Sequence, residues 1–153
     1  MRLEMRLNGV GLTCAVEPNE LLVQHLREAH SLFGAKVGCD SSNCGACTVL
    51  VDNLPVRSCS LLAVQAEGRD VLTIEGLASD GVANRIAEEL VERCGIQCGF
   101  CTPGIVIVST WLLKSGEPVT EASVRAALDG NLCRCTGYHN IVASILALAG
   151  FER

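Results

Sequence analysis

The stretch GCDSSNCGACTV, residues 38–49, places Cys39, Cys44 and Cys47 within nine positions. Their neighbours are mostly glycine, alanine and serine, and these small residues let a loop curve closely around a bound group. A lone cysteine is commonly a small buried hydrophobe, but three cysteines at these intervals in a loop are not explained by packing. The stretch therefore predicts a loop that is wrapped around an inorganic centre.

The fourth member of this set is Cys59, which completes the pattern C-x4-C-x2-C-x11-C. This is the spacing of plant-type 2Fe–2S ferredoxins. Structural zinc sites more often use two C-x2-C units, so the interval of four residues favours the cluster over a zinc ion. We predict that Cys39, Cys44, Cys47 and Cys59 bind one 2Fe–2S cluster.

The composition excludes several other classes of protein. The 153 residues carry 12 Lys and Arg against 17 Asp and Glu, and only 3% are aromatic. Nucleic-acid binding requires clustered cations and usually stacking rings, so it is not expected. No apolar run approaches the roughly 20 residues that span a bilayer, and the first residues do not resemble a signal peptide. We expect a cytoplasmic chain, in which ten cysteines indicate metal or redox chemistry rather than disulfides.

The first half of the chain has the alternating pattern of strands. Leu3, Met5 and Leu7 fall on one face of a first strand, and Asn8-Gly9 predicts a hairpin turn. One helix, at residues 20–29, interrupts the strands. The predicted strands are 2–7, 12–16, 48–51, 55–58 and 70–74. Together they predict a small α+β domain over residues 1–76.

The second half, residues 77–153, has helical spacing instead. Ile86, Leu90 and Val91 are predicted to line one face of its first helix. The second helix begins at Thr102-Pro103, with proline at its first position, and ends at Gly116. The third runs over residues 120–128, and the fourth carries Ile141, Ile145 and Leu148. Four short helices joined by short loops predict a four-helix bundle.

Two further cysteine pairs lie in loops of this helical half, in QCGFCTPG (97–104) and NLCRCTGY (131–138). Two such pairs can supply four thiolates to one centre. Spacing alone leaves both an iron–sulfur cluster and a zinc ion open. The ligands of this second centre would be Cys98, Cys101, Cys133 and Cys135.

The remaining residues that could bind a metal have no clear pattern. Cys14 and Cys94 are predicted to be small buried hydrophobes. Phe100, which lies between two cysteines of the second centre, is predicted to belong to the core. The three histidines, His25, His30 and His139, lack the spacing of metal ligands.

Taken together and in this order, GCDSSNCGACTV, RSC, QCGFCTPG and NLCRCTGY resemble the iron–sulfur subunit of the molybdenum hydroxylases. That family includes xanthine dehydrogenase, aldehyde oxidoreductase and bacterial carbon monoxide dehydrogenase. The resemblance covers essentially the whole chain. It implies a ferredoxin-like β-grasp domain followed by a four-helix domain, each holding one 2Fe–2S cluster.

The resemblance also implies the role of each cluster. The cluster of Cys39 and its partners would face a flavin subunit that carries FAD, and the helical cluster would face a large molybdopterin subunit. Gln97 and Cys135 would approach the pterin. The chain would then transfer electrons from molybdenum to FAD within a hetero-oligomeric enzyme and perform no substrate chemistry itself. Two alternatives remain open at this stage, a stand-alone ferredoxin and a zinc-stabilised scaffold.

Overall fold

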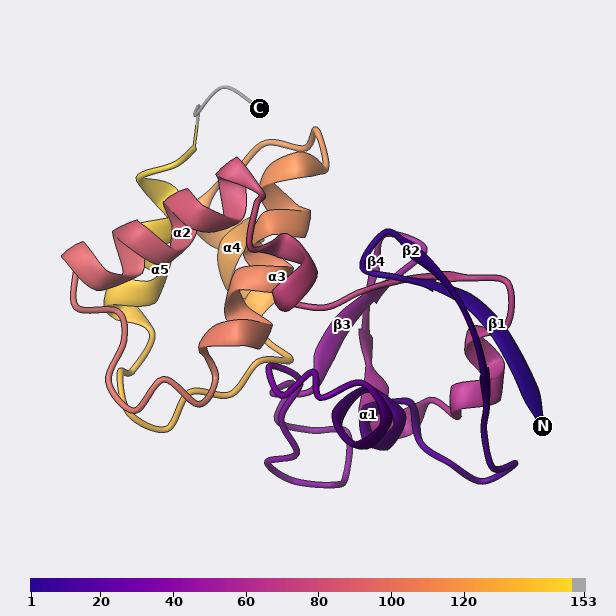
Figure 1. The fold of residues 1–153 in the computed structure, drawn as a ribbon. Helices are drawn as coiled ribbons and strands as arrows, with labels where there is room; N and C mark the ends of the chain where they lie inside the picture. The colour runs from indigo at the N-terminus through magenta and orange to yellow at the C-terminus, as the bar shows by residue number, and fades with distance from the viewer. Residues whose placement is uncertain (150–153) are drawn as a thin grey trace.

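The computed structural model describes residues 1–149, which form a mixed five-stranded sheet wrapped around a short helical segment, followed by four helices (Figure 1). The sheet has the strand order β2-β1-β5-β3-β4. β1 and β5 pair in parallel, and the other neighbouring strands pair antiparallel. The strands are β1 (Arg2–Leu7), β2 (Val10–Ala15), β3 (Thr48–Val51), β4 (Leu54–Arg57) and β5 (Asp70–Leu72). The α+β fold predicted from the sequence is confirmed.

The predicted hairpin joins β1 to β2. Asn8 and Gly9 both have positive φ, at 51° and 82°, as a tight two-residue hairpin turn requires. On β1, Leu3, Met5 and Leu7 are all buried, so the alternating pattern correctly identified the inner face. β5 ends two residues earlier than predicted, and a 3₁₀ turn over Glu75–Leu77 follows.

The segment inside the sheet is less regular than predicted. α1 (Leu22–Gln24) has a single turn of α-helix, and the chain continues as a π-helix over His25–Ala29. Leu22 and Leu26 are fully buried in the same apolar cluster as the inner face of β1. π-helical turns are rare and frequently occur at functional sites. In this one, His25 is buried next to the sheet.

The helical half contains α2 (Gly81–Glu92), α3 (Thr102–Lys114), α4 (Glu121–Leu128) and α5 (His139–Leu146). α2 and α4 each pack against both α3 and α5, which gives the predicted bundle. Asp80 caps α2 by accepting hydrogen bonds from the backbone N–H groups of Val82 and Ala83. Within residues 1–149, no helix is both long and apolar enough to cross a membrane.

One predicted core position in α2 is wrong. Ile86 and Leu90 are buried, but the Val91 side chain is 65% exposed. Residues 86 and 90 are four apart and lie on one face of the helix, whereas residue 91 is turned roughly 100° further round the axis. Val82 and Ala83 complete the buried face instead.

The two halves share part of their packing. Leu50 of β3 belongs to the apolar cluster of the helical half, and α3 packs against β3. The Arg57 guanidinium donates a hydrogen bond to the Gly130 carbonyl, 3.2 Å away, in the loop that follows α4. The sheet and the bundle are therefore joined by side-chain packing and hydrogen bonds as well as by the chain.

Candidate metal centres

The first cysteine loop turns its backbone N–H groups towards a cysteine sulfur. The Cys39 sulfur accepts hydrogen bonds from the N–H groups of Cys44 at 3.3 Å and Ser41 at 3.4 Å. Positive φ at Asp40 and Ser42 produces this curvature. The hydrogen bonds, first that from Cys44, lower the pKa of Cys39 to about 6. The loop is thus built to stabilise negative charge on this sulfur, as cluster binding requires.

Cys47 and Cys59 lie at the ends of the strand pair β3–β4. Cys47 directly precedes β3 and is buried, while Cys59 follows β4 within a 3₁₀ turn. Burial raises the pKa of Cys47 to about 11, while hydrogen bonding with Cys59 acts on this pKa in both directions. A metal bound at this thiol would supply the positive charge that favours its ionised form. The structure therefore brings the predicted fourth residue, Cys59, to the loop.

The second cysteine set also comes together, from the loops before α3 and before α5. The sulfurs of Cys98 and Cys135 lie 3.5 Å apart. Burial, and then a side-chain interaction with Cys133, raises the pKa of Cys101 to about 12. Cys101 is the N-cap of α3, one residue before the position predicted from Thr102.

The sulfurs of Cys98 and Cys135 form a close pair. A tetrahedral metal bound to two thiolates at about 2.3 Å holds their sulfurs about 3.8 Å apart. The 3.5 Å between Cys98 and Cys135 fits two ligands of one metal. This distance alone does not separate a zinc ion from a two-iron centre, because both bind pairs of thiolates at about this separation.

Two side chains that the sequence did not single out hold the second loop in place. The Thr136 hydroxyl donates a hydrogen bond to the Cys133 sulfur at 3.1 Å, and this bond lowers the pKa of Cys133 although burial acts to raise it. The Tyr138 hydroxyl accepts from the Cys133 N–H at 2.7 Å and donates to the Asn131 carbonyl at 3.0 Å. Tyr138 therefore closes the loop across its base.

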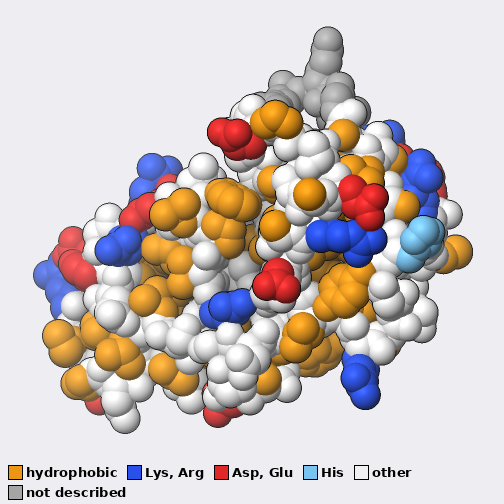
Figure 2. Space-filling view, turned by 180° about the vertical axis from the view of Figure 1, so that it is seen from behind, with side chains coloured by type: hydrophobic (Ala, Val, Ile, Leu, Met, Phe, Trp, Pro, Cys, Tyr) orange, Lys and Arg blue, Asp and Glu red, His pale blue; other side chains and the backbone are white. Residues whose placement is uncertain are grey.

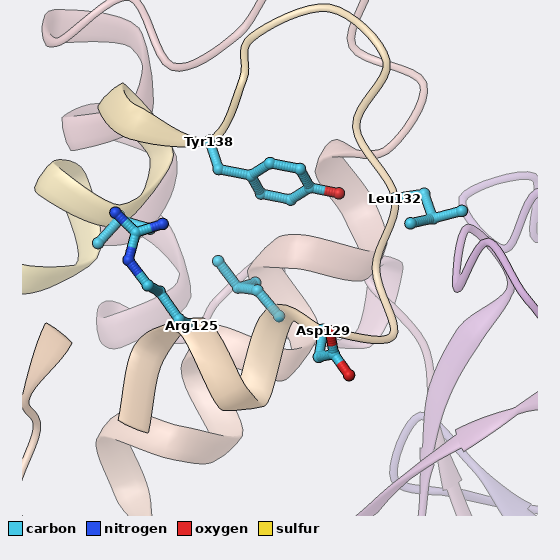
Figure 3. Close-up of a pocket in the computed structure, with 6 residues that line it drawn as sticks. Arg125, Asp129, Leu132 and Tyr138 are labelled. Atoms are coloured by element: carbon cyan, nitrogen blue, oxygen red, sulfur yellow. The ribbon is translucent and has the colours of Figure 1, made fainter. Parts of the chain in front are cut away.

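Tyr138 also lines a surface hollow beside this loop, with a volume of about 320 Å³. In Figure 3 its ring reaches from the start of α5 towards the loop segment that carries Leu132, while Arg125 projects from α4 and Asp129 directly follows that helix. The hollow contains none of the cluster cysteines among its lining residues. We therefore regard it as a consequence of the tyrosine bridge rather than as a binding site.

The two cysteine loops are joined directly by a contact that we call the loop junction, formed by residues 44–45 and 130–132. The Leu132 N–H donates a 2.8 Å hydrogen bond to the Cys44 carbonyl. The Asn131 side chain, which is buried, donates to the Gly45 carbonyl at 3.1 Å. Cys44 belongs to the first cysteine set and Leu132 precedes Cys133 of the second. One hydrogen bond thus links a residue of the first set to the residue that directly precedes a member of the second.

A second contact between the loops involves Phe100, which the sequence predicted to be in the core. Its side chain is 45% exposed because it lies over the first loop instead. A side-chain carbon added at Gly38 would lie 3.0 Å from both the Phe100 ring and the Cys44 sulfur. Only glycine leaves this space free, so Gly38 allows the two loops to approach each other.

Gln97 lies beside the second set, as expected for its motif. Its side-chain amide donates a 3.2 Å hydrogen bond to the Cys135 carbonyl. Gln97, Cys98 and Cys135 are all exposed. This end of the second loop is therefore accessible to another molecule.

The prediction for Cys94 is wrong, because its side chain is exposed. Cys94 has φ of 55° and follows the C-terminal end of α2, where the N–H of Gly95 bonds back to the Leu90 carbonyl. A left-handed residue of this kind ends the helix and directs its side chain outward.

Charged side chains of both signs are interspersed on the described part of the face in Figure 2, between apolar groups. The exposed large apolar residues of the described chain include Phe33, Val37 and Phe100 near the first cysteine loop. These three line one shallow hollow together with Arg27 and Lys36. Exposed apolar groups that gather beside a site are typical of surfaces that bind another protein.

Comparison with known families finds two matches, one after the other along the chain. Residues 5–73 match the family described as 2Fe-2S iron-sulfur cluster binding domain. Residues 73–146 match a second family, described as [2Fe-2S] binding domain. Two 2Fe–2S clusters therefore replace the zinc alternative that the spacing of the second set had left open.

Curated relatives align along nearly the whole chain. The nicotine 6-hydroxylase small subunit of Paenarthrobacter nicotinovorans is 43% identical over 150 residues, covering 98% of this chain and 90% of the relative. The xanthine dehydrogenase iron-sulfur-binding subunit of Escherichia coli is 40% identical, covering 94% of this chain and 91% of the relative. A crystal structure of quinoline 2-oxidoreductase from Pseudomonas putida 86 contains a chain that is 41% identical with a TM-score of 0.88, covering 95% of this chain and 90% of that one.

Proposed function

Because this chain belongs to the family of iron–sulfur small subunits of the molybdenum hydroxylases, we propose that it conducts electrons from a molybdopterin site on one partner subunit to FAD on another. Each cluster, when bound, accepts and returns one electron. The part of this chain is to hold the clusters, fix their separation and set their potentials. The proposed ligands are Cys39, Cys44, Cys47 and Cys59 for one cluster, and Cys98, Cys101, Cys133 and Cys135 for the other.

The hydrogen bond between the Leu132 N–H and the Cys44 carbonyl is the observation that carries this proposal. It connects the two ligand sets through a short stretch of backbone, so electrons need not cross a solvent gap. A stand-alone ferredoxin needs a single cluster and would not need this junction. The pairing of sulfurs also suggests that Cys98 and Cys135 bind one iron of the helical cluster, and Cys101 and Cys133 the other.

The exposed edge formed by Gln97, Cys98 and Cys135 is the proposed contact with the molybdopterin subunit. The apolar hollow near the first loop, lined by Phe33 and Val37, is the proposed contact with the flavin subunit. We propose that the boundary between the two domains lies between residues 76 and 77, and we expect the complex in the cytoplasm. Electrons would then enter at the helical half and leave from the sheet half.

The relatives named above belong to enzymes named for nicotine, xanthine and quinoline, and each of these compounds contains a nitrogen heterocycle. We propose the same class of substrate for the complex that contains this chain. Such compounds are therefore the first to be tried as reductants of the purified complex. Flavin reduction by one of them provides the assay for the order of the two clusters.

Two ligand variants test the order. In Cys101→Ala, the helical cluster should be lost and substrate should no longer reduce FAD, while the cluster of Cys39 keeps its EPR signal. In Cys44→Ala, substrate should still reduce the helical cluster, but FAD should stay oxidised. Cys94→Ala, which removes an exposed thiol outside both sets, is the control and should behave as wild type. Normal reduction of FAD in Cys101→Ala would contradict the serial order, and isolation of an active monomer would contradict the complex.

A further inference from the structure

A third group of possible metal ligands lies away from both cysteine loops. Cys14 on β2, His25 at the start of the π-helix and His30 just after its end have donor atoms that all lie within 4.8 Å of one another. The His25 Nε2 is 3.3 Å from the Cys14 sulfur and 3.2 Å from the His30 Nε2. No metal ion is needed to bring these three donor atoms together, because the fold of residues 1–149 already places them side by side.

A carboxylate fixes the orientation and tautomer of the central histidine. The His25 Nδ1 lies 3.0 Å from an oxygen of Glu20, and the ring is only 1% exposed. The carboxylate accepts the Nδ1 proton, so in the neutral ring Nε2 carries a lone pair. Metal-binding histidines usually have this arrangement, with the second ring nitrogen donating to a carboxylate. The lone pair of His25 is thus already directed at Cys14 and His30.

Hydrogen bonding alone leaves this cluster incompletely satisfied. One lone pair on the His25 Nε2 faces two possible donors, the Cys14 thiol and the His30 ring. The two imidazole rings meet edge to face, with centroids 4.8 Å apart and planes at 75°. The candidate cation position lies among the three donor atoms. A cation at that position would use the sulfur and both nitrogens at once.

We propose that Cys14, His25 and His30 bind one zinc ion, with Glu20 holding His25 in place. In a tetrahedral zinc site with Zn–N of about 2.0–2.1 Å and Zn–S of about 2.3 Å, neighbouring donors lie about 3.3–3.6 Å apart. The separations in the structure are 3.3 Å and 3.2 Å, at and slightly below the short end of this range, and the third pair, Cys14 and His30, lies within 4.8 Å. One thiolate and two imidazoles form a donor set that zinc accepts readily.

Charge and access also fit a divalent cation. A thiolate at Cys14 and the Glu20 carboxylate together balance the two positive charges of zinc. Cys14 and His30 are both partly exposed, so an ion can enter from solvent and a water molecule can complete its coordination. The buried imidazole of His25 supplies the rigid side of the site.

The position of the site suggests what zinc would do. β2 is an edge strand of the sheet and pairs only with β1, whereas His25 and His30 belong to the segment packed inside the sheet. An ion held by both elements would fasten the edge strand to the core. Zinc has no redox chemistry, so it would stabilise the domain without joining the electron path.

The test uses the full chain carrying both clusters, with iron and sulfide each verified at four per chain, before and after one equivalent of Zn²⁺. We expect one zinc per chain by elemental analysis. X-ray absorption at the zinc edge should show one sulfur at about 2.3 Å and two or three nitrogen or oxygen neighbours at about 2.0–2.1 Å. Zinc that had replaced iron in a cluster site would show four sulfurs.

Cys14→Ala and His30→Gln should each lose this zinc while keeping four irons, and Cys94→Ala should keep both metals. Retention of the clusters shows that the variants are folded, and far-ultraviolet circular dichroism provides a second check. The proposal would be overturned by a zinc environment of four sulfurs, by zinc that persists in both variants, by copper bound at these residues in place of zinc, or by no binding at one equivalent.

Discussion

Gly45 offers a sharp test of the loop junction, because a single methyl group should push the two cysteine loops apart. Its φ is +68°, and a side-chain carbon added there would lie 2.1 Å from the Gly130 carbonyl oxygen and 2.8 Å from the Asn131 side-chain nitrogen. Gly68 has nearly the same φ, +70°, but a carbon added there would meet nothing within 4 Å. Gly45→Ala and Gly68→Ala therefore share the backbone penalty and differ in the clash.

The size of the effect follows from these distances. In both variants, an L-residue in the left-handed backbone region lowers the stability by about 1–2 kcal/mol. In Gly45→Ala the loops must also separate by more than about 1 Å to restore an ordinary contact of about 3.5 Å. Overpacking of this kind costs about 1–3 kcal/mol, and each hydrogen bond lost at the junction adds about 1 kcal/mol. We expect Gly45→Ala to be less stable than Gly68→Ala by about 2–4 kcal/mol, or roughly 30- to 1,000-fold in equilibrium constant.

The assay is the loss of visible cluster absorbance in urea, followed over time in parallel for both variants. Native-state strain that is relieved on unfolding accelerates unfolding, so Gly45→Ala should bleach at least about tenfold faster than Gly68→Ala. Reduction of the flavin by substrate should also slow in Gly45→Ala alone, since the path between the clusters passes through the junction. Equal bleaching rates in the two variants would refute the reasoning that the loops are in tight contact at Gly45.

The remaining predictions concern the second cysteine loop. Thr136→Val removes the hydroxyl that donates to the Cys133 sulfur. It should lower the reduction potential of the helical cluster by about 20–60 mV, because a hydrogen bond is worth about 1 kcal/mol and about 1.4 kcal/mol corresponds to 59 mV for one electron. Thr136→Ser keeps the hydroxyl and should leave the potential unchanged, and an unchanged potential of Thr136→Val in potentiometric EPR would refute this role. Arg134→Ala, which removes a cation between two ligands, should lower the same potential, and no change would mean that Arg134 points to solvent or a partner. Tyr138→Phe leaves the Cys133 N–H without its acceptor and should destabilise the loop by about 1–3 kcal/mol. The helical cluster should then bleach faster in urea. Bleaching at the wild-type rate would show that water replaces the hydroxyl.

The regular parts of the fold were predictable because they follow local rules. Leu3, Met5 and Leu7 alternate as a half-buried strand must, and Asn8-Gly9 can adopt the positive φ that the hairpin needs. The cysteine spacings predicted both ligand sets because the shape of a cluster constrains the loop around it. Such signals lie within about a dozen residues of sequence. The assignment of individual ligands stays a prediction until it is tested.

The features that the sequence did not disclose depend on contacts between distant segments. Leu132 meets Cys44, and Asn131 meets Gly45, across more than 80 positions of the chain. An asparagine or leucine carries no local signal of such a partner. The residue type alone predicts that Phe100 lies in the core, yet its ring covers the first loop because Gly38 leaves space for it.

The same limit explains why the Cys14, His25 and His30 cluster was missed. Cys14 is eleven positions from His25, on a strand, and no metal motif has that spacing. His25 and His30 are five apart, which would place them on different faces of an α-helix. The π-helix over His25–Ala29 turns more widely and brings them onto the same side, where their ring nitrogens lie 3.2 Å apart.

The most direct test of the central claim, that one chain holds two separate 2Fe–2S clusters in its two halves, is quantitative EPR of the dithionite-reduced chain. The account predicts two distinct signals that together integrate to two spins per chain. Cys44→Ala should abolish one signal and Cys101→Ala the other, each leaving its counterpart unchanged in shape. Loss of both signals in either variant, or one signal that survives both substitutions, would contradict the claim that the two cysteine sets bind independent clusters.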